Sequence, residues 1–269
     1  MSGRVLPLQG STEPWHGGQV TESVTCVLAP NPSPWTLDGT NTWIVGAPGS
    51  RSAIVIDPGP QEVGHQAAVR QAAEERDQRI VSVVLTHGHI DHAEGARAFA
   101  ESLGVDVRAV DPQHRLGAEG LGDGDAVSAG DWALRVVATP GHSGDSVCLV
   151  HPDGILTGDT VLGRGTSLVA WPDGRLGDYL DSLARLRDIA AGAEQLLPGH
   201  GPVLGDPAGV LDAYLAHRRA RLVEVEEVLA SGVTDVGEIV AIVYADVPRA
   251  VWPAAELTVR AQLDYLANN

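Results

Sequence analysis

Short apolar runs that end at a glycine, a proline or a polar turn recur along the first two hundred residues of the chain. Four of these runs cover residues 81–85, 134–138, 154–156 and 195–197. They are rich in β-branched residues or leucine, which predicts four short buried strands. A turn that carries histidine or aspartate follows each run, so polar side chains are expected where the strands end.

The apolar spacing becomes helical after residue 205. Asp206 and Pro207 are typical of an N-cap and a first helical turn. The next apolar residues share one helical face, which predicts a long amphipathic helix that ends near Gly232. This face contains Leu211, Leu215, Leu222, Val225 and Leu229. A second helix is predicted after Thr234 as its cap, and a third from Ala254 onward.

Length and composition agree with one large domain and a small one. The chain has 269 residues, and its hydrophobic fraction of 43% is ample for a buried core. We expect the boundary between residues 1–205 and 206–269. No run approaches the ~20 apolar residues of a membrane span, and residues 1–8 lack the apolar run of a signal peptide. A cytoplasmic protein is therefore expected.

Charge and cysteine content exclude some classes of function. The formal net charge is −17, and all 18 basic residues are arginines, so covalent lysine chemistry is excluded. Nucleic-acid affinity depends largely on neutralising phosphates, so we expect no DNA partner. Cys26 and Cys148 both lie in apolar segments, which predicts two buried thiols and no disulfide.

Residues 86–92 hold three imidazoles and a carboxylate within one turn. Imidazole nitrogen and carboxylate oxygen are the ligands that Zn²⁺ takes when thiolates are absent. Later turns add two histidines and an aspartate, and the full set of candidate ligands is His87, His89, Asp91, His92, His142, Asp159 and His200. Seven ligands are too many for one tetrahedral ion, so we predict two metal ions.

The other five histidines have no ligand-like neighbour at short spacing, and we predict that none of them binds metal. They are His16, His65, His114, His151 and His217.

The H-x-H-x-D-H run and the three later ligands together resemble the metallo-β-lactamase fold superfamily over roughly residues 20–205. The resemblance implies the α+β class and a four-layer αββα sandwich with two metals at one edge of the facing sheets. It assigns the first metal to His87, His89 and His142. It assigns the second metal to Asp91, His92 and His200. Asp159 would bridge the two ions, and Asp57 would support the ligands from behind.

Residues 31–43, 163–167 and 216–221 resemble the LACTB2-like branch of this superfamily. In that branch a winged-helix module follows the catalytic domain, and some members cleave single-stranded RNA. This chain departs from the pattern, because three helices leave no residues for a two-stranded wing. We therefore expect a winged-helix-like subdomain without its wing.

The arginines near this subdomain allow two interpretations. From residue 206 onward the chain has five arginines and ten acidic residues. A segment with this excess of negative charge is poorly suited to bind RNA in general. A local basic patch could still form from Arg164, Arg218, Arg219 and Arg221. A solvated helix face is the more frequent meaning of such a run.

Two ions about 3.5–4 Å apart lower the pKa of a shared water. We therefore expect a zinc-dependent hydrolase that uses a metal-bridging hydroxide; iron and manganese remain open as the metal. Asp91 is the expected catalytic residue, because it would hold the second metal and help orient the hydroxide. Loops around residues 35–41 and 163–171 would select the substrate through Trp35, Asn41, Arg164, Thr166 and Trp171.

The substrate stays open at this point. A single-stranded RNA phosphodiester or a small ester ranks first, and a glyoxalase II-type thioesterase ranks second. A β-lactamase ranks low, since such an enzyme is normally exported. A sulfur dioxygenase with one iron remains open. So does a non-enzymatic metal-binding protein whose helical tail pairs with a partner, and the oligomeric state is also open.

Overall fold

A computed structural model describes residues 13–117 and 119–269 of the protein. Residues 1–8, which carry the prediction about a signal peptide, lie outside this described part. Among the helices that are described, none has both the length and the apolar run needed to cross a membrane. The cytoplasmic location stays a prediction.

The first half of the chain forms a six-stranded sheet in the order β1-β2-β3-β4-β5-β6. Its strands are β1 (Gly18–Gln19), β2 (Val24–Leu28), β3 (Asn41–Val45), β4 (Ser52–Ile56), β5 (Arg79–Val84) and β6 (Asp106–Arg108). The pairing is antiparallel from β1 to β4 and parallel from β4 to β6. Parallel neighbours need a crossover, and the helices α1 (Val63–Glu74) and α3 (Ala96–Leu103) supply it.

The second sheet has the order β12-β11-β10-β9-β8-β7. Its strands are β7 (Ala126–Ala129), β8 (Trp132–Ala138), β9 (Val147–His151), β10 (Gly154–Gly158), β11 (Gln195–Pro198) and β12 (Leu204–Gly205). Only β10 and β11 pair in parallel, and α4 (Leu176–Ile189) connects them. The four strands predicted from apolar runs are confirmed as β5, β8, β10 and β11.

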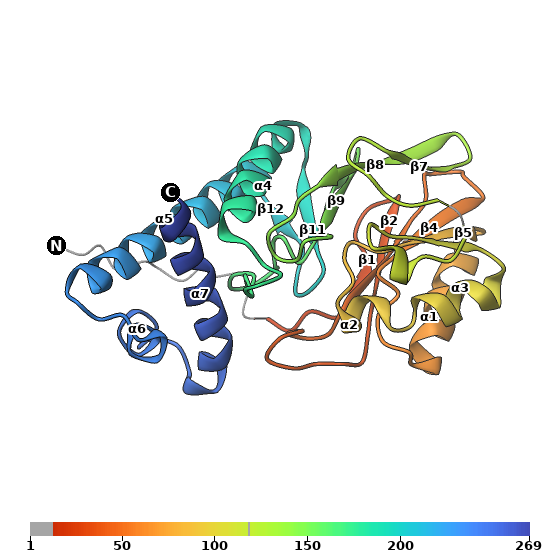
Figure 1. Cartoon of the computed structure of the whole chain (residues 1–269). Coiled ribbons are helices and arrows are strands. Elements are labelled where there is room, and N and C mark those ends of the chain that lie inside the picture. The colour runs from red at the N-terminus through yellow and green to blue at the C-terminus, as the bar shows by residue number, and fades with distance from the viewer. Residues whose placement is uncertain (1–12, 118) are drawn as a thin grey trace.

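Three apolar clusters fill the spaces between four layers. The first lies between the two sheets and includes Trp43 and Leu134. The second joins the first sheet to α1 and α3 around Phe99, and the third joins the second sheet to α4 and α5 (Pro207–Ala230) around Tyr179. Figure 1 shows the helices on the two outer sides of the facing sheets. The α+β class and the αββα sandwich are confirmed.

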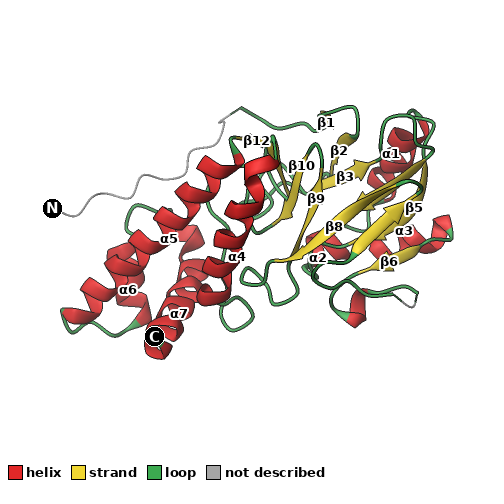
Figure 2. Ribbon diagram, turned by 90° about the horizontal axis from the view of Figure 1, so that it is seen from above, coloured by secondary structure: helices red, strands yellow, loops and turns green. Residues whose placement is uncertain are grey.

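The three helices predicted after residue 205 are present as α5, α6 (Val236–Val243) and α7 (Trp252–Asn268). They enclose a fourth apolar cluster around Val225, Ile239 and Val259. Figure 2 shows this group at one end of the molecule, beside α4. The predicted cap Thr234 is wrong, because the Asp235 carboxylate accepts the hydrogen bond from the Glu238 amide.

Residues 206–269 are all described, and they contain helices and no strand. The expected winged-helix-like subdomain is therefore helical throughout. Tyr214 in the first half of α5 belongs to the cluster under the second sheet, and Val225 in its second half belongs to the terminal cluster. The division of the chain after residue 205 stays a prediction.

Both interpretations of the arginine run need correction. Arg218 and Arg221 lie in the middle of α5 and are only 5% and 9% exposed, so neither forms a solvated face or a surface patch. Arg164 pairs with Asp38. Only Arg219 of the group is exposed. These arginines are therefore largely used inside the fold.

The two cysteines behave as predicted. Cys26 and Cys148 are free and buried. Burial raises the pKa of the Cys148 thiol to about 11, and it also raises that of Cys26. Neither thiol is reactive at neutral pH, since the thiolate is the nucleophilic form.

Candidate metal centre

The candidate ligands lie at the carboxyl ends of strands. Residues 86–92 follow β5 and run into the short helix α2 (Ile90–Ala93), whereas the other ligands follow β8, β10 and β11. β8 and β10 both pair with β9 in antiparallel fashion, so they run in the same direction as each other and as β11. Their carboxyl ends therefore meet at one edge of the second sheet.

Backbone contacts join the two sheets at this edge. The Val147 amide donates to the Thr86 carbonyl at 2.8 Å, and the Asn41 amide donates to the Gly199 carbonyl at 2.8 Å. The Trp43 indole donates to the Pro198 carbonyl at 3.0 Å. These bonds bring the ligand turn after β5 beside the ligand turns of the second sheet.

The first group of ligand atoms consists of three imidazole nitrogens. Nδ1 of His89 lies 3.0 Å from Nε2 of His87 and 3.0 Å from Nε2 of His142. His87 and His142 are buried, and His89 is exposed. One side of this group therefore faces solvent.

The second group combines two imidazoles with a carboxylate. Nε2 of His92 lies 3.2 Å from Nε2 of His200, and the Oδ2 atom of Asp91 lies 3.1 Å from the latter nitrogen. The distance from Asp91 Oδ2 to Nε2 of His92 is 3.5 Å. Asp91 retains 26% of its side-chain surface, so it lies at the open side of the group.

The Asp159 carboxylate lies between the two groups. Its Oδ2 atom is 3.8 Å from Nε2 of His142 and 3.4 Å from Nε2 of His200, and its Oδ1 atom is 3.4 Å from Nε2 of His92. Oδ1 is buried, yet it accepts no hydrogen bond from any described residue. A buried carboxylate oxygen without a hydrogen bond requires a nearby positive charge or water, and a metal ion or a protonated His92 would supply that charge.

These spacings suit metal ions. Two ligands at 2.0–2.1 Å from a tetrahedral ion lie about 3.4 Å apart. The distances between ligand atoms in both groups are close to this value. Imidazole nitrogens that face one another at 3.0–3.2 Å also repel unless a proton or a cation lies between them. The donor set therefore fits two divalent cations.

The second nitrogen of each buried imidazole has a partner that fixes the ring. Nδ1 of His87 lies 3.1 Å from Oγ1 of Thr86, and Nδ1 of His142 lies 2.7 Å from the Leu168 carbonyl. Nδ1 of His200 lies 3.2 Å from the Gly39 carbonyl. A proton on Nδ1 leaves the lone pair of Nε2 free for a metal.

Asp57 performs the same task for His92. Its carboxylate accepts from the Thr86 amide at 2.7 Å, from the Thr86 hydroxyl at 2.6 Å and from Nδ1 of His92 at 2.9 Å. The side chain is 1% exposed, and its backbone has a left-handed φ of 50°. These three donors occupy the Asp57 carboxylate and fix the ring of His92, although Asp57, His87 and His92 are also spaced to hold a metal. The role of Asp57 as a support for the ligands stays a prediction.

The ionisable groups fall into two sets when no metal is present. Burial lowers the pKa of His87 well below its ordinary value, and it lowers that of His142 too. Burial also opposes charge on His92 and His200, but Asp159 and other carboxylates outweigh it. They raise the pKa of His200 to about 9 and that of His92 well above its ordinary value. A metal must therefore displace protons mainly from the second group.

Two glycines leave room for the ligands. A Cβ atom at position 199 would lie 2.4 Å from Asp159 Oδ1 and 2.8 Å from His92 Cε1. A Cβ atom at position 158 would lie 2.5 Å from Oγ1 of Thr86, and Gly158 has a positive φ of 47°. Only glycine permits this close approach of the backbone, to two candidate ligands at position 199 and to Thr86 at position 158.

The residues predicted to contact substrate separate into two kinds. Trp35 is 52% exposed and Trp171 is 41% exposed, so both remain available to a substrate, and Thr166 is half-buried. Asn41 is fully buried, and its side-chain amide nitrogen donates to the carbonyls of Pro198 and Gly201 at 2.9 and 2.8 Å. It has no surface to offer a substrate, and instead it holds the turn that carries His200.

Arg164 and Ile90 differ in how far their side chains are exposed. Arg164 is half-buried and pairs with Asp38, which ties together the two loops predicted to select the substrate. The sequence interpretation missed Ile90, which lies between two ligands and is 72% exposed. The sequence feature that could have identified Ile90 is that it is the apolar residue between the two polar ligands His89 and Asp91.

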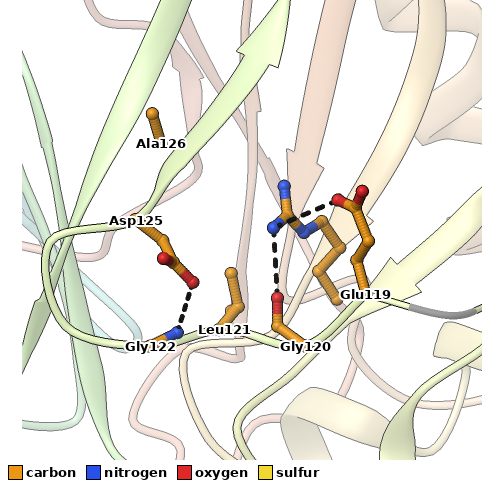
Figure 3. Close-up of a pocket in the computed structure, with 7 residues that line it drawn as sticks. Glu119, Gly120, Leu121, Gly122, Asp125 and Ala126 are labelled. Atoms are coloured by element: carbon orange, nitrogen blue, oxygen red, sulfur yellow. Dashed lines mark hydrogen bonds and ion pairs between the residues drawn. The ribbon is translucent and has the colours of Figure 1, made fainter.

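The remaining histidines and the other hollows of the surface lie apart from this cluster. Among the described residues, the groups of three or more side chains that are spaced to hold a metal include none of the five other histidines. A hollow of about 480 Å³ lies between β6 and β7, where Arg108 donates to the Gly120 carbonyl at 3.1 Å and pairs with Glu119 (Figure 3). It contains no candidate ligand.

Comparison with known proteins gives matches over both parts of the chain. A family model described as "Metallo-beta-lactamase superfamily" matches residues 35–200. One described as "Beta-lactamase associated winged helix domain" matches residues 236–269. The beta-lactamase-like protein 2 homolog of Caenorhabditis elegans is 31% identical over 269 aligned residues, which cover 93% of this chain and 86% of that protein.

A further relative and a solved structure differ in what they support. The atrochrysone carboxyl ACP thioesterase of Aspergillus fumigatus is 36% identical over 190 residues, which cover 67% of this chain and 56% of that protein. The crystal structure of a beta-lactamase domain protein from Burkholderia ambifaria superposes with a TM-score of 0.78 at 23% identity. The superposition covers 97% of this chain and 92% of that chain, and it supports the fold alone.

Proposed function

Because this chain belongs to the metallo-β-lactamase superfamily and has the LACTB2-like relatives that its sequence suggested, we propose that it is a hydrolase dependent on two divalent metal ions. Zinc is the metal that suits imidazole and carboxylate ligands in a tetrahedral arrangement. The first ion would be held by His87, His89 and His142. The second would be held by Asp91, His92 and His200, with Asp159 bridging the two.

One observation carries this proposal. Asp159 lies within 3.4–3.8 Å of ligand nitrogens from both groups, and its Oδ1 atom is buried without a hydrogen bond from the described residues. A carboxylate in that position is stable when it bridges two cations. Bound divalent cations would supply Lewis acidity, which activates water and polarises a carbonyl or phosphoryl oxygen.

The side chains of the site would divide the remaining tasks. Asp57 and Thr86 fix the ring of His92, so that it presents Nε2 to the site. Asp91 faces the open side, where its carboxylate would orient the attacking water and accept a proton. His89 is the exposed ligand of the first group and borders the path of a substrate.

An ester or thioester of an apolar acyl group is the substrate class that we favour over RNA. Ile90, Trp35 and Trp171 expose large apolar surfaces on the segments that carry or anchor the ligands. Two of the four arginines that could have formed a basic patch for RNA, Arg218 and Arg221, are buried. One relative is named as a thioesterase that acts on an acyl carrier protein, which supports the same class.

Metal analysis and turnover assays on one preparation test the proposal. Plasma mass spectrometry should find two metal ions per chain. Acyl thioesters and p-nitrophenyl esters should be hydrolysed faster than single-stranded RNA or nitrocefin. RNA as the better substrate would contradict the proposed class while leaving the hydrolase assignment intact.

A pair of variants tests the site itself. Asp159→Ala should lower the metal content and abolish turnover with the fold kept, because the bridge between the groups is lost. His114→Ala is the matched control, since His114 lies against Gly88 of the ligand turn but outside the ligand groups. A folded Asp159→Ala variant with both ions and full turnover would disprove the bridge. Severe metal loss in His114→Ala would show that the ligands are misassigned.

A further inference from the structure

The Asp159 ligand begins a long segment that has no regular secondary structure. Residues 159–175 connect β10 to α4 and contain neither helix nor strand. Besides Asp159, the segment includes Leu168, whose carbonyl fixes the ring of His142. The geometry of two candidate ligands therefore depends on whatever holds this segment in place.

Two tyrosines from the helical side hold the first part of the segment. The Tyr179 hydroxyl, from α4, donates to the Thr160 carbonyl at 2.7 Å. The Tyr214 hydroxyl, from α5, accepts from the Leu162 amide at 3.0 Å and lies 3.0 Å from the Gly165 carbonyl. Both tyrosines are buried, so these bonds are shielded from water.

Arg218 holds the second part through Ser167. Its Nη2 atom donates to the Ser167 carbonyl, and its guanidinium lies 5.0 Å from the centre of the Tyr179 ring. The Ser167 hydroxyl in turn donates to the Asp159 carbonyl and lies 3.2 Å from Nδ1 of His142. Ser167 thus joins α5 to the backbone of one ligand and to the ring of another.

The environment of Arg218 is unusual for a charged side chain in a fold. It is 5% exposed, and among the described residues no carboxylate pairs with it, although buried arginines are normally paired. Its Nε atom is also buried without a partner. The guanidinium therefore uses its charge on a carbonyl oxygen and an aromatic face, and both lie beside the Asp159 segment.

Arg221, one turn further along α5, provides an internal comparison. It is also buried, and it lies 5.0 Å from the centre of a tyrosine ring, that of Tyr244. However, it pairs with Glu224 at 3.0 Å and with Asp246 at 3.3 Å, and it donates to the Val243 carbonyl. These partners all lie within residues 224–246, in α5, α6 and the turn after α6, so the contacts of Arg221 stabilise the C-terminal part of the chain and do not reach the Asp159 segment.

We propose that Arg218 is a positioning residue for the metal centre, through which helix α5 holds the Asp159 segment in its ligand geometry. The inference rests on the proposed function in that it takes Asp159 and His142 as metal ligands. Helix α5, which follows the last ligand His200 in the sequence, would thus raise the metal affinity through Arg218 and Ser167. The C-terminal helices would then contribute to the metal centre itself.

The test compares Arg218→Met with Arg221→Met in the full chain. Methionine keeps much of the apolar stem and removes the donors and the charge. Zinc affinity is measured by competition with a chromophoric chelator, and hydrogen exchange of residues 159–168 is measured by mass spectrometry on the metal-free proteins. Arg218→Met should weaken zinc binding about 10–100-fold, the range typical for groups that orient ligands. It should also speed exchange in residues 159–168.

Arg221→Met should leave both measurements at the parent values, although it should lower the unfolding temperature. Arg218→Lys should recover part of the zinc affinity, because an ammonium can donate to the Ser167 carbonyl but cannot stack on Tyr179 as a plane.

Two results would overturn the inference. In one, the Arg218→Met variant binds zinc with the affinity of the parent, and its residues 159–168 exchange hydrogen as slowly as in the parent. The other is an equal loss of affinity in Arg221→Met, which would indicate general destabilisation. A parent protein that binds two ions but hydrolyses nothing would refute the proposed function and leave this inference standing. If the parent binds no zinc, the proposed function fails, and hydrogen exchange alone decides whether Arg218 holds the segment.

Discussion

Replacing Asp57 by asparagine tests how far a buried acid behind the ligands controls the metal centre. The substitution keeps the size of the side chain, and asparagine tolerates the left-handed φ of 50° at this position. It exchanges one carboxylate oxygen for an amide group that can only donate. The native carboxylate accepts three hydrogen bonds, two from Thr86 and one from His92.

Neither orientation of the asparagine amide satisfies all three donors. With the NH₂ group at the Oδ1 position, it would face the Thr86 amide at 2.7 Å. With the NH₂ group at the Oδ2 position, it would face Nδ1 of His92 at 2.9 Å. His92 would then have to move its proton to Nε2, which removes the lone pair that the second metal needs.

The expected cost has two parts. A hydrogen bond to a charged group contributes about 1.5–3 kcal/mol, so the metal-free protein should lose stability of that order. Loss of a group that orients a ligand typically costs about 10–100-fold in metal affinity, which corresponds to about 1.4–2.7 kcal/mol. We expect the larger weakening at the second ion, because Asp57 hydrogen-bonds His92 directly, whereas it reaches His87 of the first group through the Thr86 hydroxyl.

Chelator competition with stepwise zinc addition resolves the two binding events. Asp77→Asn is the matched control, since Asp77 also has a positive φ, 57°, but is exposed. That variant should bind both ions as the parent does. If Asp57→Asn binds the second zinc ion with parental affinity, Asp57 does not orient His92 toward that ion.

Three further predictions concern the ligand cage, its protons and its rim. Gly199→Ala should abolish zinc binding, because the new methyl would lie 2.4 Å from Asp159 Oδ1; a variant with both ions by mass spectrometry would contradict the close approach. The pKa of His200, raised from 6.5 to about 9, gives the metal-free protein stability that is present below pH 6.5 and lost as pH rises through about 9. Zinc should therefore release protons when it binds at about pH 7.5. Titration calorimetry in buffers of different ionisation enthalpy measures this release, and a binding enthalpy that is the same in every buffer would contradict it. Trp171→Ala should raise KM for a long-chain thioester more than for an acetyl thioester, and equal KM changes would argue that the indole only packs.

Local sequence determined the strands and the chemistry at their ends. Apolar runs closed by glycine or proline predict β5, β8, β10 and β11 without knowledge of their partners, because burial of a strand requires a run of this kind. The turn that follows each strand presents its polar side chains at the sheet edge. For this reason the histidines and aspartates that the structure brings together at one edge could all be named from the sequence.

Helix periodicity was equally readable in the C-terminal part, but the fate of single side chains was not. The three helices were predicted, whereas Arg218 and Arg221 were expected on a surface and are buried. A run of arginines predicts only that these side chains favour solvent. Whether an aromatic ring or a carbonyl oxygen instead stabilises the buried guanidinium depends on which helices pack together.

The tertiary structure alone decided how the ligands are held. Asn41 binds the carbonyl of Pro198, 157 residues away, and backbone carbonyls at Gly39 and Leu168 fix the rings of His200 and His142. Every residue has a backbone carbonyl, so no sequence pattern marks the ones that orient a ligand. The sequence therefore specifies which atoms can bind metal, and the packing of the two sheets with α5 specifies how those atoms are aimed.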